Sequence, residues 1–318
     1  MARFLIVLSA LTCLSACVTP RQGRPAEPVA PAAPLEIVRA LSSEEMAGRR
    51  AGSPGGAAAR TYLAAQIAAL GLPVTEQPFA FEGRRGAGSG VNLITRVEGT
   101  GAETGAEAPL LVVTAHYDHL GTRDDTVFPG ADDNASGVAG ALALARRLAE
   151  RPARHDVMIV LTDAEEMGMR GARALFDGGP LTGQRVAANL NLDMIGRDDG
   201  VELYAVGTHH TPALRPVLEA VAARAPVPLA FGYDQPTDDP RDDWTELSDH
   251  AAFHARGVPF VYLGVEDHAD YHRPTDTYER LDEAFLLGAI ETAERVLRAL
   301  DAAVAEGLLR ATDDAPGV

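Results

Sequence analysis

Short apolar runs and helical patterns alternate along most of this sequence. Four largely apolar runs, at 109–115, 156–162, 187–193 and 258–264, are typical of strands that are buried on both faces of a sheet. Segments with apolar residues at helical spacing separate most of these runs. The alternation predicts an α/β fold: a single three-layer α/β/α domain built around a mostly parallel, mixed central sheet.

The remaining pattern adds further elements to this core. Strands are also predicted at 73–81, 91–97, 201–205 and 228–232, and helices at 35–41, 56–70, 136–150, 169–176, 212–224, 249–256 and 282–307. The last helix has Asp282 as its expected N-cap. One face of that helix should pack on the sheet, and it consists of Leu286, Ile290, Ala293, Leu297, Leu300 and Val304.

Composition excludes several classes of function. Hydrophobic residues make up 46% of the 318 residues, which is enough for a sizeable core, and the formal net charge of −17 argues against nucleic acid as a partner. The sequence contains no lysine, which excludes Schiff-base chemistry and a lysine-dependent phosphate loop. The only cysteines are Cys13 and Cys17, so the expected domain has no disulfide, no thiol nucleophile and no cysteine-ligated zinc.

The N-terminus has the pattern of a bacterial lipoprotein precursor. Arg3 precedes an apolar run too short to span a bilayer, and the run ends in Leu14-Ser15-Ala16-Cys17, which resembles a lipobox. This resemblance implies removal of residues 1–16 as a signal peptide and lipidation of Cys17. The alternative is an ordinary secretory signal cleaved nearby, which would give a secreted periplasmic protein.

The expected domain lies between two less ordered ends. Residues 17–34 are rich in proline and alanine and are expected to form a tether, followed by one domain over 35–310 and a disordered tail over 311–318. Val18 stands where an aspartate would favour the inner membrane, so we expect an outer-membrane anchor that faces the periplasm. The lipid is then the only expected contact with a membrane, and the protein is expected to be a monomer.

Acidic and imidazole side chains follow the predicted strands. His116 and Asp118 are two residues apart at a strand end and point to the same side. One could bind a metal while the other orients its imidazole, although a loop histidine beside a capping aspartate explains the pair equally well. Asp132 and Asp133 precede a helix, so they are either N-capping residues or a turn containing a carboxylate that bridges two cations.

Three further strand ends carry candidates. Glu165 and Glu166 are either the acidic first turn of a helix or a metal ligand beside a general base. Asp193 ends an apolar strand, and a buried carboxylate there needs a cation or hydrogen-bond donors. His272 follows the last predicted strand, and alone it is weak evidence. The same is true of His250, His254 and His268.

Considered together, these candidates predict one site. Ligands of open α/β sheets bind outside the carboxyl ends of the strands, where residues distant in sequence meet. Oxygen and imidazole donors without thiolate fit zinc, manganese or cobalt. Two cations that share a carboxylate lie about 3.5–4 Å apart and can activate one water between them. The residues therefore predict a two-metal hydrolase.

The order of the motifs also resembles a known family. The motifs are TAHYDHLG (114–121), PGADDNASG (129–137), TDAEEMGMRG (162–171), NLDMIG (191–196), SDHAAFHARGVPFVYLG (248–264) and DYHRPTDTY (270–278). Their order resembles the co-catalytic dizinc aminopeptidases, which include bacterial leucyl aminopeptidases and relatives of glutamate carboxypeptidase. The similarity extends from about Leu41 to Val304.

This resemblance implies a metal site with defined roles. The implied ligands are His116 and Asp193 for one zinc ion, Glu166 and His272 for the other, and Asp133 as the bridge between them. Asp118 would orient His116, and Glu165 would be the general base. The resemblance implies two Zn²⁺ per chain, with Mn²⁺ or Co²⁺ as substitutes, and a cis bond between Asp133 and Asn134.

The implied activity is that of an exopeptidase, and most specifically an aminopeptidase. A metal-activated hydroxide would hydrolyse the N-terminal bond of a peptide substrate. A carboxypeptidase, a dipeptidase or a glutaminyl cyclase on the same scaffold is the alternative, followed by a non-catalytic binding protein. Some relatives place a tyrosine before Ser-Asp-His, where this chain has Thr245-Glu246-Leu247, so Tyr233 or Tyr271 would have to replace it. The acidic loop 237–246 is the expected site for the substrate's amino group.

Overall fold

The structure, a computed structural model, describes residues 30–83, 86–101, 108–197 and 202–310. Eight strands form its main sheet. They are β1 (Thr75–Gly83), β2 (Gly86–Val97), β3 (Leu110–His116), β6 (Asp156–Thr162), β7 (Val186–Leu192), β8 (Leu203–Val206), β9 (Leu229–Phe231) and β10 (Phe260–Gly264). Their order across the sheet is β1-β2-β6-β3-β7-β10-β8-β9.

The four central strands, β6, β3, β7 and β10, are parallel to one another. The antiparallel pairs lie towards the edges, where β1 joins β2, β2 joins β6, and β8 joins β10. Strand β9 completes the sheet in parallel with β8. The predicted mixed sheet with a parallel centre is confirmed. The parallel centre matters for function, because it brings the carboxyl ends of four adjacent strands to one edge.

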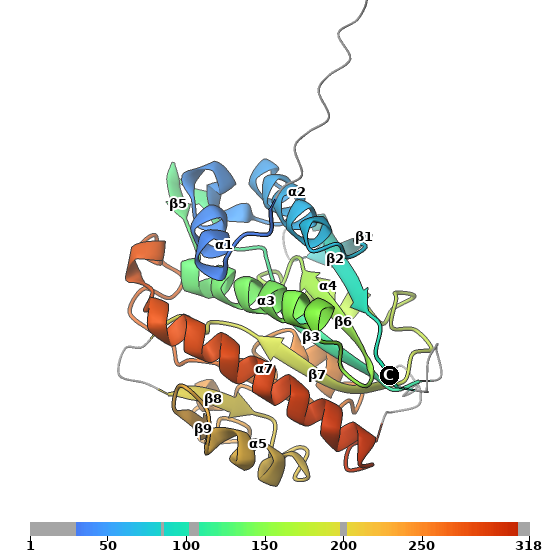
Figure 1. Cartoon of the computed structure of the whole chain (residues 1–318). Coiled ribbons are helices and arrows are strands. Elements are labelled where there is room, and N and C mark those ends of the chain that lie inside the picture. The colour runs from blue at the N-terminus through green and yellow to red at the C-terminus, as the bar shows by residue number, and fades with distance from the viewer. Residues whose placement is uncertain (1–29, 84–85, 102–107, 198–201, 311–318) are drawn as a thin grey trace, which may run out of the picture.

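Helices cover both faces of the sheet, as predicted. One face carries α1 (Pro34–Leu41), α2 (Pro54–Ala69), α3 (Gly137–Glu150), α5 (Leu214–Ala222) and α7 (Glu283–Ala305). In Figure 1, α3 and α7 run side by side in front of the sheet. The opposite face carries the short helices α4 (Arg170–Ala174) and α6 (His250–His254).

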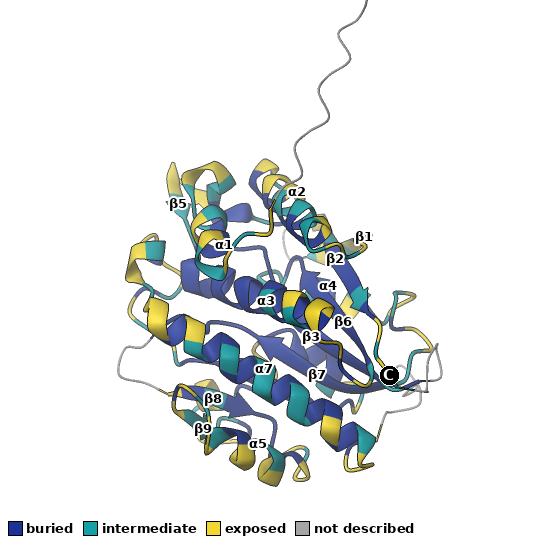
Figure 2. Cartoon of the chain, in the orientation of Figure 1, coloured by how far each residue is buried: buried dark blue, intermediate teal, exposed yellow. Residues whose placement is uncertain are grey.

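Strand β3 shows why the central strands are continuously apolar. Leu111 and Val113 pack in the larger core beneath α3 and α7, while Leu110 and Val112 pack in the smaller core beneath α4 and α6. All seven residues of β3 are buried, and Figure 2 shows the strands of the sheet centre in the colour of buried residues. Successive side chains point to opposite faces, so a strand covered on both sides is apolar at most positions, and its buried polar residues pair by hydrogen bonds, as Thr114 does with Asn191.

The last helix agrees closely with the sequence pattern. The Asp282 carboxylate accepts a hydrogen bond of 2.8 Å from the backbone N–H of Phe285 and so caps α7. All six apolar residues of the predicted face are buried. The helix therefore covers the sheet with a continuous apolar stripe, as its spacing indicates.

Several local features differ from the expectation. Strand β1 begins and ends two residues later than predicted, and β2 begins five residues earlier, because the two strands pair along a hairpin that extends beyond the part of β2 paired to β6. A small hairpin, β4 (Gly121–Arg123) with β5 (Thr126–Phe128), and the 3₁₀ helix η1 (Glu44–Arg49) were not predicted. Three-residue strands are too short to show a periodic pattern.

The expected signal peptide, Cys17 and most of the tether lie outside the described residues, as does the tail 311–318. The end of the tether already contacts the domain, since the backbone N–H of Ala32 donates a 2.8 Å hydrogen bond to Gln66. Within the ranges that the structure describes, no helix combines the length and apolar character that crossing a bilayer requires.

A buried arginine connects η1 to the loop in front of α3. The Arg49 side chain is fully buried and donates to the backbone oxygens of Tyr117 at 2.8 Å and Gly130 at 2.6 Å. It also donates to three more backbone oxygens, those of Leu41, Pro129 and Asp133. A single guanidinium thus satisfies five carbonyls from three segments, which fixes the loop 129–133 against the end of β3.

Replacing Arg49 by methionine should lower the free energy of unfolding by at least about 3 kcal/mol, because five buried carbonyls lose their donor. Urea denaturation followed by circular dichroism measures this loss. The control is Arg146→Met, on the exposed surface of α3, which should change stability by less than about 0.5 kcal/mol. A loss below about 1 kcal/mol for Arg49→Met would contradict the structural role given to this side chain.

Candidate metal centre

The predicted site residues meet at the carboxyl ends of the parallel strands. His116 ends β3, the Glu165-Glu166 pair follows β6, and Asp193 follows β7. His272 lies in the loop after β10, and Asp133 lies in the loop that leads into α3. Because β6, β3, β7 and β10 are neighbours in that order, their ends bring together residues that are more than 150 positions apart in the sequence.

A first group of donors surrounds the end of β3. The Nε2 atom of His116 lies 3.4 Å from Oδ1 of Asp133 and 3.3 Å from Oδ1 of Asp193. The second oxygen of Asp193 accepts a 2.6 Å hydrogen bond from the hydroxyl of Ser248, which fixes the orientation of this carboxylate. One imidazole and two carboxylates therefore face a common point, close enough to bind one ion together.

A second group lies on the other side of Asp133. Its other oxygen, Oδ2, lies 3.2 Å from Nε2 of His272, and Glu166 Oε2 lies 3.4 Å from the same nitrogen. A residue that the sequence reasoning missed, His119, also belongs here, since its Nδ1 atom is 2.7 Å from Oε1 of Glu166. Asp133 thus directs one oxygen to each group, which is the geometry expected of a bridging carboxylate.

Asp118 and Glu165 lie beside the donors and contact each other. The Nδ1 atom of His116 is 3.1 Å from the backbone oxygen of Asp118 and 3.8 Å from its carboxylate, so the backbone oxygen is the acceptor that orients the ring. The Asp118 carboxylate instead accepts a 3.0 Å hydrogen bond from the backbone N–H of Glu165. Asp118 therefore positions the loop that carries Glu165 and Glu166.

The structure distinguishes the two adjacent aspartates. Asp132 is turned into the protein, where it accepts a 2.7 Å hydrogen bond from the N–H of Gly196 and lies 3.2 Å from His268. Asp133 points to the donor groups, and the bond between Asp133 and Asn134 is cis, as the resemblance implies. A buried carboxylate, Asp276, accepts the backbone N–H groups of both aspartates and holds this turn.

The remaining candidates have structural contacts. His250 is buried, with Nε2 2.8 Å from the backbone oxygen of Trp244, and the ring of His254 lies 4.4 Å from that of His210. Tyr271 stacks on His272 with ring centroids 3.9 Å apart, whereas the hydroxyl of Tyr233 donates to Glu266. Of the two candidate tyrosines, Tyr271 is therefore the one that contacts a candidate metal donor, His272.

The acidic loop 237–246 uses two of its carboxylates for its own structure. Asp239 forms an exposed ion pair with Arg241, and Asp243 accepts hydrogen bonds from the backbone and hydroxyl of Thr245. Its expected role in binding an amino group remains a prediction.

Burial and close approach change the pKa values of the acidic and imidazole groups at this site. Burial raises the pKa of Glu165 well above its usual value and also raises the pKa of Glu166. Burial opposes protonation of His116, yet the adjacent Asp193 carboxylate raises the pKa of this imidazole well above normal. His119 differs, because burial lowers its pKa to about 3 and leaves the ring neutral.

The donor set fits a divalent transition metal. Oxygen and imidazole donors suit zinc, and the carboxylates at this strand edge would repel one another without a cation. Two buried polar atoms at the second group, Nδ1 of His119 and Oε1 of Glu166, have no hydrogen-bond partner among the described residues. Buried polar atoms without partners are costly, and a bound cation would satisfy them.

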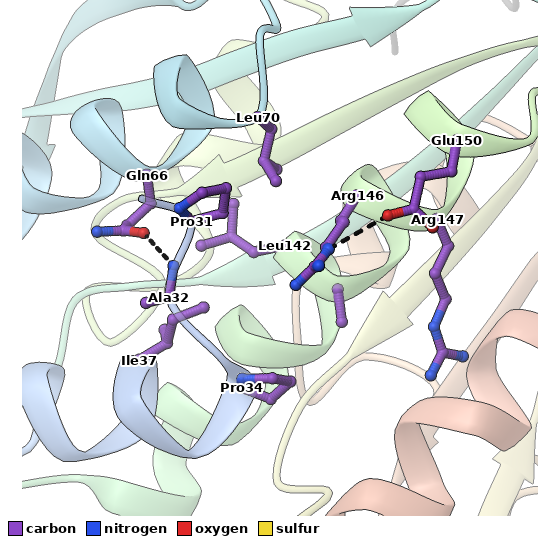
Figure 3. Close-up of a pocket in the computed structure, with 11 residues that line it drawn as sticks. Pro31, Ala32, Pro34, Ile37, Gln66, Leu70, Leu142, Arg146, Arg147 and Glu150 are labelled. Atoms are coloured by element: carbon purple, nitrogen blue, oxygen red, sulfur yellow. Dashed lines mark hydrogen bonds and ion pairs between the residues drawn. The ribbon is translucent and has the colours of Figure 1, made fainter. Parts of the chain in front are cut away.

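A separate cavity lies away from this centre. It has a volume of about 240 Å³ and lies between α1, α2 and α3. Figure 3 shows the residues that line it. Its lining includes Ala32, Ile37, Gln66, Leu142 and Arg146. None of the metal-donor residues lines it, so it is no part of the candidate centre.

Comparison with known proteins is consistent with this geometry. Residues 92–297 match the model of "Peptidase family M28", and this range contains every donor described above. A probable leucine aminopeptidase of the fungus Arthroderma otae is 29% identical over 196 residues, which cover 58% of this chain and 52% of that protein. The chain spans about half the length of the first curated relatives it matches.

Solved structures share the fold at low sequence identity. The zinc aminopeptidase from Bacillus subtilis superposes with a TM-score of 0.67 at 16% identity, covering 90% of this chain and 98% of that one. A glutaminyl cyclase from Porphyromonas gingivalis superposes with a TM-score of 0.66 at 21% identity, covering 83% and 96%. At these identities the likeness establishes the fold and leaves the reaction open.

Proposed function

This chain belongs to peptidase family M28, and we propose that it is a zinc-dependent exopeptidase, most specifically an aminopeptidase. The observation that carries the proposal is the position of Asp133, whose two oxygens face two separate donor groups. Beside them lies Glu165, which makes none of the ion-pair contacts described above and is available as a base. The relatives described as aminopeptidases support this specific activity.

Two zinc ions per chain would be held by the two groups. His116 and Asp193 would bind one ion, Glu166 and His272 the other, and Asp133 both. When bound, zinc acts as a Lewis acid on a peptide carbonyl and makes water more acidic. Mn²⁺ or Co²⁺ would suit the same donors.

Glu165 would move the proton in this reaction. Its backbone is fixed by the hydrogen bond to Asp118, and burial raises the pKa of its carboxyl group above the usual value, which makes the carboxylate a stronger base. Glu165 would take a proton from the attacking water and deliver it to the amine that leaves. The neighbouring Glu166 is close to His272 and serves as a ligand, so the two adjacent glutamates have separate tasks.

Glutaminyl cyclase activity is the second candidate, because cyclases are among the solved structures with this fold. In a cyclase the amine of an N-terminal glutamine attacks the side-chain amide carbonyl of the same residue and ammonia leaves, so the nucleophile is internal and no water is added. Carboxypeptidase and dipeptidase activities would use the same donors with a different substrate orientation. The peptidases differ in which end of the peptide they process. The cyclase differs from all of them because it adds no water.

The zinc-loaded protein should release arylamine from unblocked aminoacyl-arylamides and leave N-acetylated versions intact. Chelation should abolish the activity, and added Zn²⁺ should restore it. Parallel assays with N-glutaminyl peptides and with peptides blocked at either end, analysed by mass spectrometry, identify the reaction. Cyclised product without hydrolysis would establish the cyclase instead, and removal of C-terminal residues would establish a carboxypeptidase.

Glu165→Gln should lower kcat by about 10²–10⁴-fold, because the amide cannot accept the proton, while zinc content and melting temperature stay close to wild type. Steady-state kinetics and elemental analysis measure both. Glu219→Gln on the exposed surface of α5 is the matched control and should change kcat less than twofold. Near-normal turnover in Glu165→Gln would remove this residue from the mechanism.

We also propose that the protein is a lipoprotein of the outer membrane that faces the periplasm. The support is the sequence Leu14-Ser15-Ala16-Cys17 after an apolar run, followed by Val18. A secreted periplasmic enzyme is the alternative, and it would have the same active site without the anchor.

The full-length precursor expressed in a Gram-negative host tests this location. Cys17→Ser should move the protein from the membrane fraction to the soluble fraction, whereas Cys13→Ser should leave it in the membrane fraction. Mass spectrometry of the wild type should find an N-terminal cysteine with attached acyl chains. An unmodified N-terminus on membrane-associated protein would exclude the lipid anchor.

A further inference from the structure

His119 is a buried histidine that neither zinc site uses in the proposed function. It follows His116 and Asp118 in the loop after β3, and its side chain has no exposed surface. Its ring packs against Gly130, where a Cβ atom would collide with the imidazole. The carbonyl of the same glycine is held by Arg49, so the turn is fixed at a position that leaves room for the ring.

The distances from His119 to the carboxylates resemble those of an expected ligand. Its Nδ1 atom is 2.7 Å from Glu166 Oε1 and 3.6 Å from Asp133 Oδ2. The Nε2 atom of His272 is 3.4 Å from Glu166 Oε2 and 3.2 Å from Asp133 Oδ2. Donors around a tetrahedral zinc ion, with bonds of about 2.0–2.1 Å, lie about 3.4 Å apart. Both imidazoles therefore approach one pair of carboxylates at spacing that suits a shared ion.

The short contact between His119 and Glu166 is not a directed hydrogen bond. Neither ring nitrogen of His119 has a hydrogen-bond partner among the described residues, and neither does Oε1 of Glu166. A nitrogen and an oxygen that are close but misaligned are typical of atoms that point at a common third atom. An imidazole buried with an unused lone pair beside two carboxylates has the properties of a metal ligand.

We propose that His119 is a direct nitrogen donor to the metal ion bound by Asp133, Glu166 and His272. This inference rests on the proposed dizinc centre. It gives the two metal sites of that centre different numbers of donors. His119, Asp133 and Glu166 lie close enough to bind one ion together, and His272 contacts the same two carboxylates, whereas the first site has His116, Asp133 and Asp193. With one donor more, the second site holds its ion more tightly, and the first site is the one that loses zinc first.

Zinc titration of the metal-free protein tests this assignment without any substrate. His119→Ala should weaken one of the two zinc affinities at least 10–100-fold and leave the other within threefold, as measured by calorimetry with a competing chelator. The matched control, His254→Ala on α6, should leave both affinities unchanged. Two unchanged affinities in His119→Ala would overturn the proposal.

Stability measurements separate metal binding from a packing role. Without metal, His119→Ala should lose only the stability that packing of the buried ring provides, because the imidazole has no hydrogen bond to lose. With saturating zinc it should melt well below the wild type, since weaker binding stabilises the folded state less. An equal drop with and without zinc would show that the ring serves packing, and the proposal would fail.

Spectroscopy distinguishes direct bonding from an effect through Glu166. In the cobalt-substituted protein, each coordinated imidazole gives a strongly shifted N–H proton signal in one-dimensional NMR. The wild type should show three such signals, from His116, His119 and His272, and His119→Ala should show two. Two signals in the wild type would refute direct bonding. A wild type that binds no zinc would refute the proposed function itself, which is a separate result.

Discussion

The candidate centre depends on one shared carboxylate. Asp133 lies between two groups of donors, with one oxygen 3.4 Å from His116 and the other 3.2 Å from His272. No other side chain described at this edge contacts imidazoles of both groups. The other donors lie at or after the ends of the four parallel strands β3, β6, β7 and β10, and the Asp133 carboxylate is what makes them one site. Positive charge is the condition for this arrangement, because buried carboxylates in such proximity repel one another.

The fold holds Asp133 by its backbone, which leaves its carboxylate free. Arg49 donates to the backbone oxygen of Asp133, and Asp276 accepts its backbone N–H. Asp132, one residue earlier, uses its side chain for the protein interior instead. The two adjacent aspartates therefore have different roles. Asp132 fixes the turn, and Asp133 faces the other candidate metal donors. Rigid support of this kind is what a metal site needs to keep its ligands in place.

Asp118 also has two roles, which connect the loop after β3 to the loop after β6. The backbone oxygen of Asp118 orients His116, and its carboxylate holds the backbone of Glu165. One residue therefore sets the position of a metal ligand and of the proposed base relative to each other. For a reaction that transfers a proton between water and a leaving amine, this relative position decides the rate more than the identity of either group.

The sequence by itself determined the architecture and the chemical types at the site. Buried strands must be apolar on both faces and helices must repeat every 3.6 residues, so the central strands and α7 could be located from pattern alone. The β4–β5 hairpin could not, because three-residue strands carry no period. The motif order supplied the candidate donors, and the resemblance to a known family implied Asp133 as the bridge. Only the tertiary structure showed that Asp132 turns into the protein interior and that His119 lies beside Glu166. The distance between side chains on neighbouring strand ends depends on strand order and loop path, which local sequence does not encode.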